Sequence, residues 1–77
     1  MSTSLDDRLV TLLSRWLARH VTDGQLREGV ATADPAQLAP DQAEAFAELQ
    51  HGLRNGIDRG DLEMLVLETL EALALGG

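Results

Sequence analysis

The segment from Asp61 to Leu75 is the most apolar part of the chain, and one helix face cannot bury all of its apolar residues. At about 100° per residue, one broad face of this segment comprises Leu62, Leu65, Val66, Thr69, Leu70 and Leu73. The other side of the segment comprises Glu63, Glu68 and Glu71, with Met64, Leu67 and Leu75 among them. Burying the first face inside the domain leaves these last three apolar residues exposed. We therefore predict that Met64, Leu67 and Leu75 bind a protein partner or a second copy of the chain.

Four segments of the chain show the apolar period of an α-helix, which predicts an all-α fold. The predicted helices cover approximately residues 5–21, 24–33, 40–54 and 59–75. The loops between them are short, so the four helices should pack as one compact bundle. A chain of 77 residues has room for a single domain, which we assign to residues 1–77.

Local signals mark the predicted helix ends. Thr22 and Gln25 have the spacing of a capping box at the start of the second helix. Asp34 precedes Pro35 and should end that helix, because a residue before proline avoids the α region. Gly56 follows the third predicted helix and is a typical C-terminal stop.

The predicted core is rich in leucine and contains few aromatic residues. It comprises Leu9, Leu13, Trp16, Leu17, Leu26, Val30, Phe46, Leu49, Leu53, Leu62, Val66, Leu70 and Leu73. Trp16 should fill the centre of this core, although a side chain of its size can also anchor an interface. His20 continues the same apolar stripe, so it should be partly buried near a helix end; a pH switch is the alternative interpretation.

The chain is acidic, with a formal net charge of −7 at pH 7, and all of its basic residues are arginines. This charge disfavours direct binding to nucleic acid, because acidic helices repel phosphate groups. Arg8, Arg15 and Arg19 line one flank of the first predicted helix and complement the glutamates of the last one. The pattern suggests an isologous dimer in which the last helix of one chain packs on the first helix of the other.

Residues with recognisable chemistry are sparse. Glu48 and His51 have the Glu-x-x-His spacing of carboxylate-bridged di-iron bundles, but they fall opposite Phe46 and Leu49 and should face water. The sequence has no cysteine, no phosphate-binding glycine loop and no serine in a nucleophile elbow. We therefore predict neither an enzyme nor a bound cofactor. A helix-turn-helix formed by the second and third predicted helices is disfavoured, since the third is mainly acidic.

Gly76 and Gly77 resemble the end of a double-glycine leader, in which an acidic, leucine-rich helix precedes the glycines. Leu70-Glu71 departs from that pattern, which has Glu-Leu in this region. A frayed helix end is the preferred interpretation. The sequence shows no signal peptide and no apolar run as long as a membrane span, so we expect a cytoplasmic protein that does not bind membranes.

These observations together favour a non-catalytic helical protein–protein interaction module. The predicted binding residues are Met64, Leu67 and Leu75 with Arg8, Arg15 and Arg19, and the expected partner is another protein or a second copy. Two alternatives stay open. One is a metal-binding bundle built on Glu48 and His51, and the other is a small transcriptional regulator that acts through its acidic surface.

Overall fold

The structure of the protein, a computed structural model, describes residues 4–75. Its α-helices are α1 (Leu5–Leu17), α2 (Asp23–Thr32), α3 (Pro40–Asn55) and α4 (Arg59–Leu75), and the single 3-10 turn η1 (Pro35–Gln37) precedes α3. No strand occurs within the described residues. The predicted all-α bundle of four helices is confirmed.

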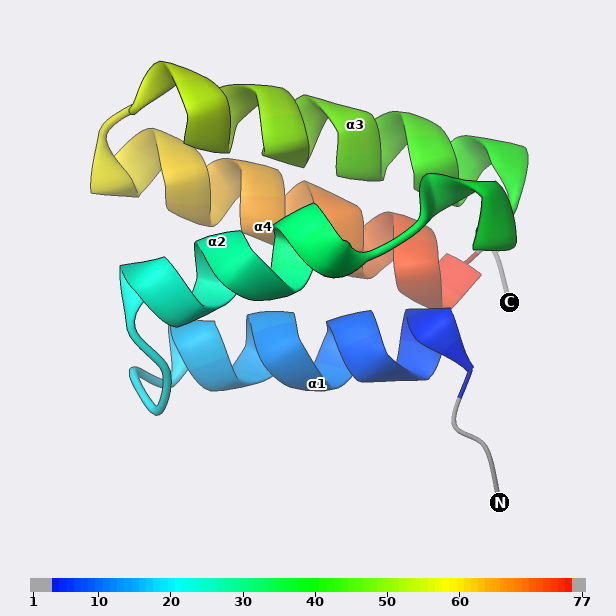
Figure 1. Cartoon of the computed structure of the whole chain (residues 1–77), viewed down its shortest axis with the longest axis horizontal. Coiled ribbons are helices and arrows are strands. Elements are labelled where there is room, and N and C mark those ends of the chain that lie inside the picture. Colours follow the sequence, from blue (N-terminus) through cyan, green and yellow to red (C-terminus); the bar gives the residue numbers. More distant parts are fainter. Residues whose placement is uncertain (1–3, 76–77) are drawn as a thin grey trace.

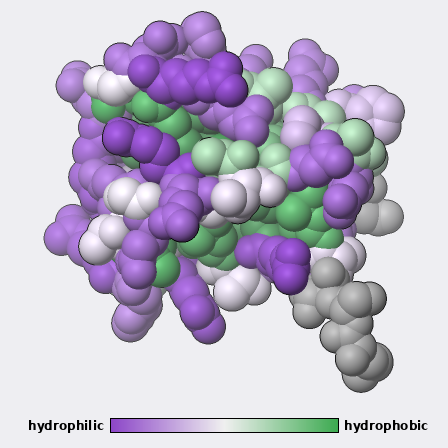
Figure 2. All heavy atoms as spheres, viewed as in Figure 1, coloured by the Kyte–Doolittle hydropathy of each residue, from purple (hydrophilic) through white to green (hydrophobic). Residues whose placement is uncertain are grey.

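Consecutive helices run in opposite directions, so the chain passes up and down the bundle (Figure 1). Figure 1 shows α1 and α3 along opposite edges, with α2 and α4 between them. Each helix contacts its two neighbours, and α3 packs most extensively against α4. Figure 2 shows that hydrophilic side chains cover most of one face, with apolar groups visible in the gaps between them.

The core consists of the inward faces of all four helices, as the apolar period predicts. Leu13, Trp16, Leu26, Phe46, Leu49 and Val66 are completely buried. The prediction was wrong for Leu17 and Leu70, which are only half-buried at the edge of the core. The core also contains Leu38, Gln42 and Gly52, which were not predicted to be in it, and Thr69, which lies on the predicted buried face of the last helix.

Gln42 and Thr69 are polar, and hydrogen bonds compensate for their burial. Gln42 Nε2 donates to the carbonyl of Leu73 (3.2 Å), and Gln42 Oε1 accepts from the backbone N–H of Ala39 (3.0 Å). Thr69 Oγ1 donates to the carbonyl of Leu65 (2.7 Å). Because a satisfied polar group costs little to bury, both residues can occupy the interface between helices.

The first helix ends at Leu17, four residues before the predicted boundary. Arg19 has a φ of +65°, and its N–H donates to the carbonyl of Trp16. The N–H of His20 donates to the carbonyl of Arg15 (2.8 Å). These bonds form a Schellman motif, which turns the chain back so that α2 can pack against α1. His20 therefore lies beyond the helix and is exposed, and its predicted partial burial was wrong.

The other predicted helix ends agree with the structure to within one residue. Thr22 Oγ1 accepts from the N–H of Gln25 (3.1 Å), and Gln25 Oε1 accepts from the N–H of Thr22 (2.8 Å). The capping box is thus formed. Gly56 adopts the left-handed conformation (φ +65°) that stops α3.

Polar contacts also form at the start of α1. The Ser4 hydroxyl donates to Asp7 Oδ2 (3.0 Å). The Ser4 side chain also lowers the pKa of Asp6. Gly76 and Gly77, with their resemblance to a leader sequence, lie outside the described residues. Within residues 4–75, no helix has the length and apolar character needed to cross a membrane.

Candidate functional site

The outward face of α4 carries three exposed apolar side chains. Met64, Leu67 and Leu75 are 60%, 52% and 80% exposed, and they are the large hydrophobic residues exposed in the described part of the chain. The opposite face of α4 is buried through Leu62, Val66, Thr69 and Leu73. One helix therefore presents an apolar surface on both sides, as its sequence pattern predicts. We call Met64, Leu67 and Leu75 the α4 stripe.

An open groove of about 540 Å³ lies between α3 and α4. Its α3 side comprises Glu44, Ala47, Glu48, His51, Gly52 and Asn55. Ile57 from the α3–α4 turn and Leu65 from α4 complete the lining. At about 100° per residue, Met64 and Leu75 fall within about 100° of Leu65 on α4, whereas Leu67 lies farther round. The α4 stripe therefore begins beside this α3–α4 groove.

Close approach of the two helices at Gly52 shapes the groove. A Cβ atom placed on Gly52 would lie 2.6 Å from Leu65 Cδ1 and 2.9 Å from Ile57 Cδ1. The missing side chain lets Leu65 and Ile57 rest directly on the α3 backbone, where they form an apolar floor. Sequence reasoning missed this groove, because its walls come from two helices and a turn.

Carboxylates border the groove on both helices. Glu44 and Glu48 line it from α3 and are exposed. On α4, Asp61 and Glu68 lie about 40° and 60° from Leu65 on the helical wheel, and both are exposed. No arginine lines the groove. The nearest basic residue along α4, Arg59, is already paired with Asp23 and Glu63. The groove is therefore apolar at its floor and negative at its edges.

Within one chain, the three predicted arginines lie apart from the α4 stripe; the predicted dimer would pair them between two copies. Arg8 lines a cavity between α1 and α2 with Leu12 and Gly29, which places it on the α2 side of α1. Arg15 lies on the same side of α1, at about 60° from Leu12. Arg19 lies in the turn after the helix. All three arginines are exposed, and none forms an ion pair with a described residue.

The predicted Glu-x-x-His pair lies at the edge of the α3–α4 groove. Glu48 and His51 are both exposed, in agreement with the interpretation that they face water. His51 Nε2 is 2.9 Å from Asn55 Nδ2. The part of the chain that the structure describes contains no group of three or more potential metal ligands. A di-iron site requires an additional carboxylate beside such a pair, and none completes it within the described residues of a single chain.

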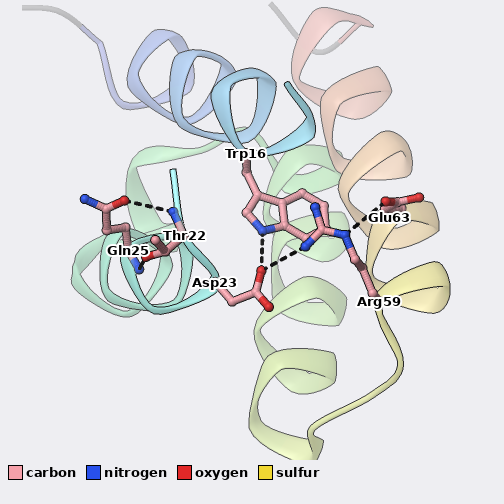
Figure 3. Close-up of polar contacts among 6 residues, drawn as sticks. All are labelled: Trp16, Thr22, Asp23, Gln25, Arg59 and Glu63. Atoms are coloured by element: carbon pink, nitrogen blue, oxygen red, sulfur yellow. Dashed lines mark hydrogen bonds and ion pairs between the residues drawn. The ribbon is translucent and has the colours of Figure 1, made fainter. Parts of the chain in front are cut away.

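A second polar cluster closes the end of the bundle around Trp16 (Figure 3). Trp16 Nε1 donates to Asp23 Oδ1 (2.8 Å), which also accepts from Arg59 Nη1 (3.2 Å). The Arg59 guanidinium lies over the indole ring, with Cζ 4.6 Å from the ring centroid. Glu63 Oε1 forms an ion pair with Nε of the same guanidinium at 3.4 Å. This cluster connects α1, α2 and α4 and stabilises the fold.

The chain matches no protein-family model, no curated protein and no solved structure in the comparisons. The fold itself defines the class, a small all-α protein with four packed helices. The candidate site within that class is the α4 stripe together with the α3–α4 groove beside it.

Proposed function

We propose that this protein is a non-catalytic interaction module that docks a protein partner through the outward face of α4. The observation that carries the proposal is the exposure of Met64, Leu67 and Leu75 on a helix whose other face already completes the core. A surface leucine by itself needs no explanation, but three long apolar side chains on one helix face are typical of a binding surface.

The gain available from covering this stripe is large for so small a protein. Full burial of a leucine or methionine side chain contributes about 1.5–3 kcal/mol. Because Met64, Leu67 and Leu75 are between half and four-fifths exposed, covering all three contributes about 3–6 kcal/mol. That is enough to support micromolar docking once further contacts offset the entropy of association.

Self-association is the second candidate, and the free arginines favour it. In this arrangement α4 of one copy packs on α1 of the other, where Arg8, Arg15 and Arg19 meet its glutamates. These three side chains are exposed and unpaired within the described residues. Ion pairs of exposed side chains contribute about 0–1 kcal/mol each, so they would orient such a dimer more than hold it together.

The remaining expectations from the sequence stay predictions. Neither a metal-binding role for Glu48 and His51 nor a regulatory role for the acidic surface has gained support from a contact in the structure. A non-enzymatic role and a cytoplasmic location are part of the same proposal.

Site-specific photo-crosslinking would test docking through α4. A photoreactive residue at position 67 should give a defined adduct in an extract of the source organism. The same residue at position 31, an exposed alanine of α2, is the control. The partner identified in this way would then be purified, and its affinity measured for wild type and for Met64→Glu/Leu67→Glu.

The proposal predicts that the double substitution weakens this binding at least tenfold. Ala31→Glu/Ala36→Glu adds two glutamates at exposed alanines away from α4 and should leave the affinity unchanged. Equilibrium sedimentation of both variants tests self-association with the same proteins. Wild type that stays monomeric and gives no adduct specific to position 67 would contradict the proposed function.

A further inference from the structure

We propose that the partner presents an amphipathic helix with lysine or arginine on both sides of an apolar ridge, and that this helix lies in the α3–α4 groove. The inference rests on the proposed function and adds the chemistry of the partner to it. It is drawn from the apolar floor of the groove, its acidic edges and the exposed residues beside it.

The floor of the groove selects an apolar ridge. Ile57 and Leu65 are half-buried on Gly52, and Ala47 lines the same groove from α3. Met64 lies about 100° from Leu65 around α4 and is 60% exposed, so it lies just outside this floor. Apolar side chains inserted between α3 and α4 would cover Ile57, Leu65 and Ala47, and a helix lying there would pass close to Met64.

The shape of the groove selects a helix. It extends along α3 from Glu44 to Asn55, about 17 Å at about 1.5 Å per residue. Three turns of a partner helix match this length, with apolar residues at intervals of three and four. The described residues contain no strand, so they offer no sheet edge to which an extended peptide could add.

The carboxylates at the edges of the groove favour a partner with positively charged side chains. Glu44 and Glu48 line the α3 side, and Glu68 lies on the same side of α4 as Leu65. No arginine of the chain lines the groove. A partner with lysine or arginine on both sides of its apolar ridge would place one row of cations against each row of carboxylates.

A second copy of this chain fits the groove poorly. If two α4 helices paired, Glu68 and Glu71 of one copy would approach the same residues of the other, in chains that each carry a formal charge of −7. The α2 side of α1 supplies Arg8 and Arg15 but no large exposed apolar residue. Neither surface combines the apolar ridge and the flanking cations that the groove requires.

Designed peptides provide the test. The probe is a labelled helical peptide of sixteen residues with leucines along one face and lysines on both sides of them. One control peptide has glutamate in place of every lysine, and a second has the same composition in scrambled order. Binding is measured by fluorescence anisotropy at low and high salt, and the contact surface is mapped from amide chemical shifts.

Two pairs of protein variants locate the binding site. Glu48→Gln should weaken binding of the lysine peptide about two- to fivefold, and Glu28→Gln, which removes an exposed glutamate of α2, should not. Ala47→Trp fills the groove and should abolish binding, whereas Ala31→Trp should not. Circular dichroism verifies that each variant is folded.

The expected result is salt-sensitive binding of the lysine peptide alone, with the largest shifts at Ala47, His51 and Leu65. Equal binding of the glutamate peptide would overturn the inference. Equal losses in Glu28→Gln and Glu48→Gln would also overturn it, because they would show general attraction to an acidic protein. A wild-type dimer that buries the groove would make a second copy the occupant. None of these results decides the proposed function, which the substitutions at Met64 and Leu67 test separately.

Discussion

Replacing Asp23 by alanine removes the oxygen that holds three helices together at one end of the bundle. Asp23 Oδ1 accepts from Trp16 Nε1 (2.8 Å) and from Arg59 Nη1 (3.2 Å). Trp16 is completely buried, and Asp23 Oδ1 is the acceptor of its N–H within the described structure. Asp23 also lies in the first turn of α2, where a carboxylate interacts favourably with the helix dipole.

Three lost interactions set the expected decrease in the free energy of unfolding. A buried N–H left without an acceptor costs about 1–3 kcal/mol. The Asp23–Arg59 ion pair contributes less, about 0.2–1 kcal/mol, because the two side chains are 60% and 44% exposed. The helix-dipole interaction adds about 0.3–1 kcal/mol. We expect Asp23→Ala to lower the free energy of unfolding by about 1.5–5 kcal/mol, out of about 4–12 kcal/mol for a domain of this size.

Urea denaturation would measure this loss. The single tryptophan of the chain reports on the cluster through its fluorescence, and far-UV circular dichroism reports on the helices. Coincident transitions by the two probes would justify a two-state analysis. Asp23→Asn keeps an oxygen acceptor for the indole N–H, so it should cost only about 0.5–1 kcal/mol.

Asp41→Ala is the matched control. Asp41 is also an exposed acidic residue in the first turn of a helix, and its loss removes about the same helix-dipole interaction. The difference between Asp23→Ala and Asp41→Ala therefore isolates the contacts with Trp16 and Arg59. If the two substitutions cost the same, the hydrogen bond to the indole does not stabilise the fold and the argument is refuted.

Further substitutions test the core and the turns. Leu13→Ala and Val66→Ala, at completely buried positions, should each lower the free energy of unfolding by about 1–5 kcal/mol in the same denaturation assay; a negligible loss at both would refute the assigned core. Arg19→Gly should raise it by about 0.5–1 kcal/mol because φ is +65° there, and Arg19→Ala, which keeps a Cβ atom, should give no such gain. Gly56→Ala should lower the melting temperature, since its φ is also +65°, whereas Gly60→Ala, with open space around it in α4, should raise it. Equal shifts for the two glycines would contradict the described turn.

Local sequence pattern was enough to predict that four helices form and that α4 has two apolar faces. Helical period is a local property, because residues three and four apart share a face in any α-helix. Only one face of a helix can pack into a small core. The pattern around Val66 therefore already implied that Met64, Leu67 and Leu75 remain outside, and the structure shows these three side chains exposed.

The sequence pattern could not predict features that depend on where the chain reverses or on how two helices meet. The end of α1 was predicted too late, because the left-handed position of its Schellman motif is usually glycine and here is Arg19. The burial of Gln42 depends on an acceptor that packing supplies, the carbonyl of Leu73 on another helix.

The α3–α4 groove also arises from packing between two helices. Its floor forms because Leu65 and Ile57 approach the backbone at Gly52, and its acidic edges lie on two different helices. No periodicity encodes the distance between helices, since that distance is set by the side chains that meet there. The α4 stripe could therefore be predicted from the sequence, whereas the groove beside it exists only because tertiary packing brings α3 and α4 together.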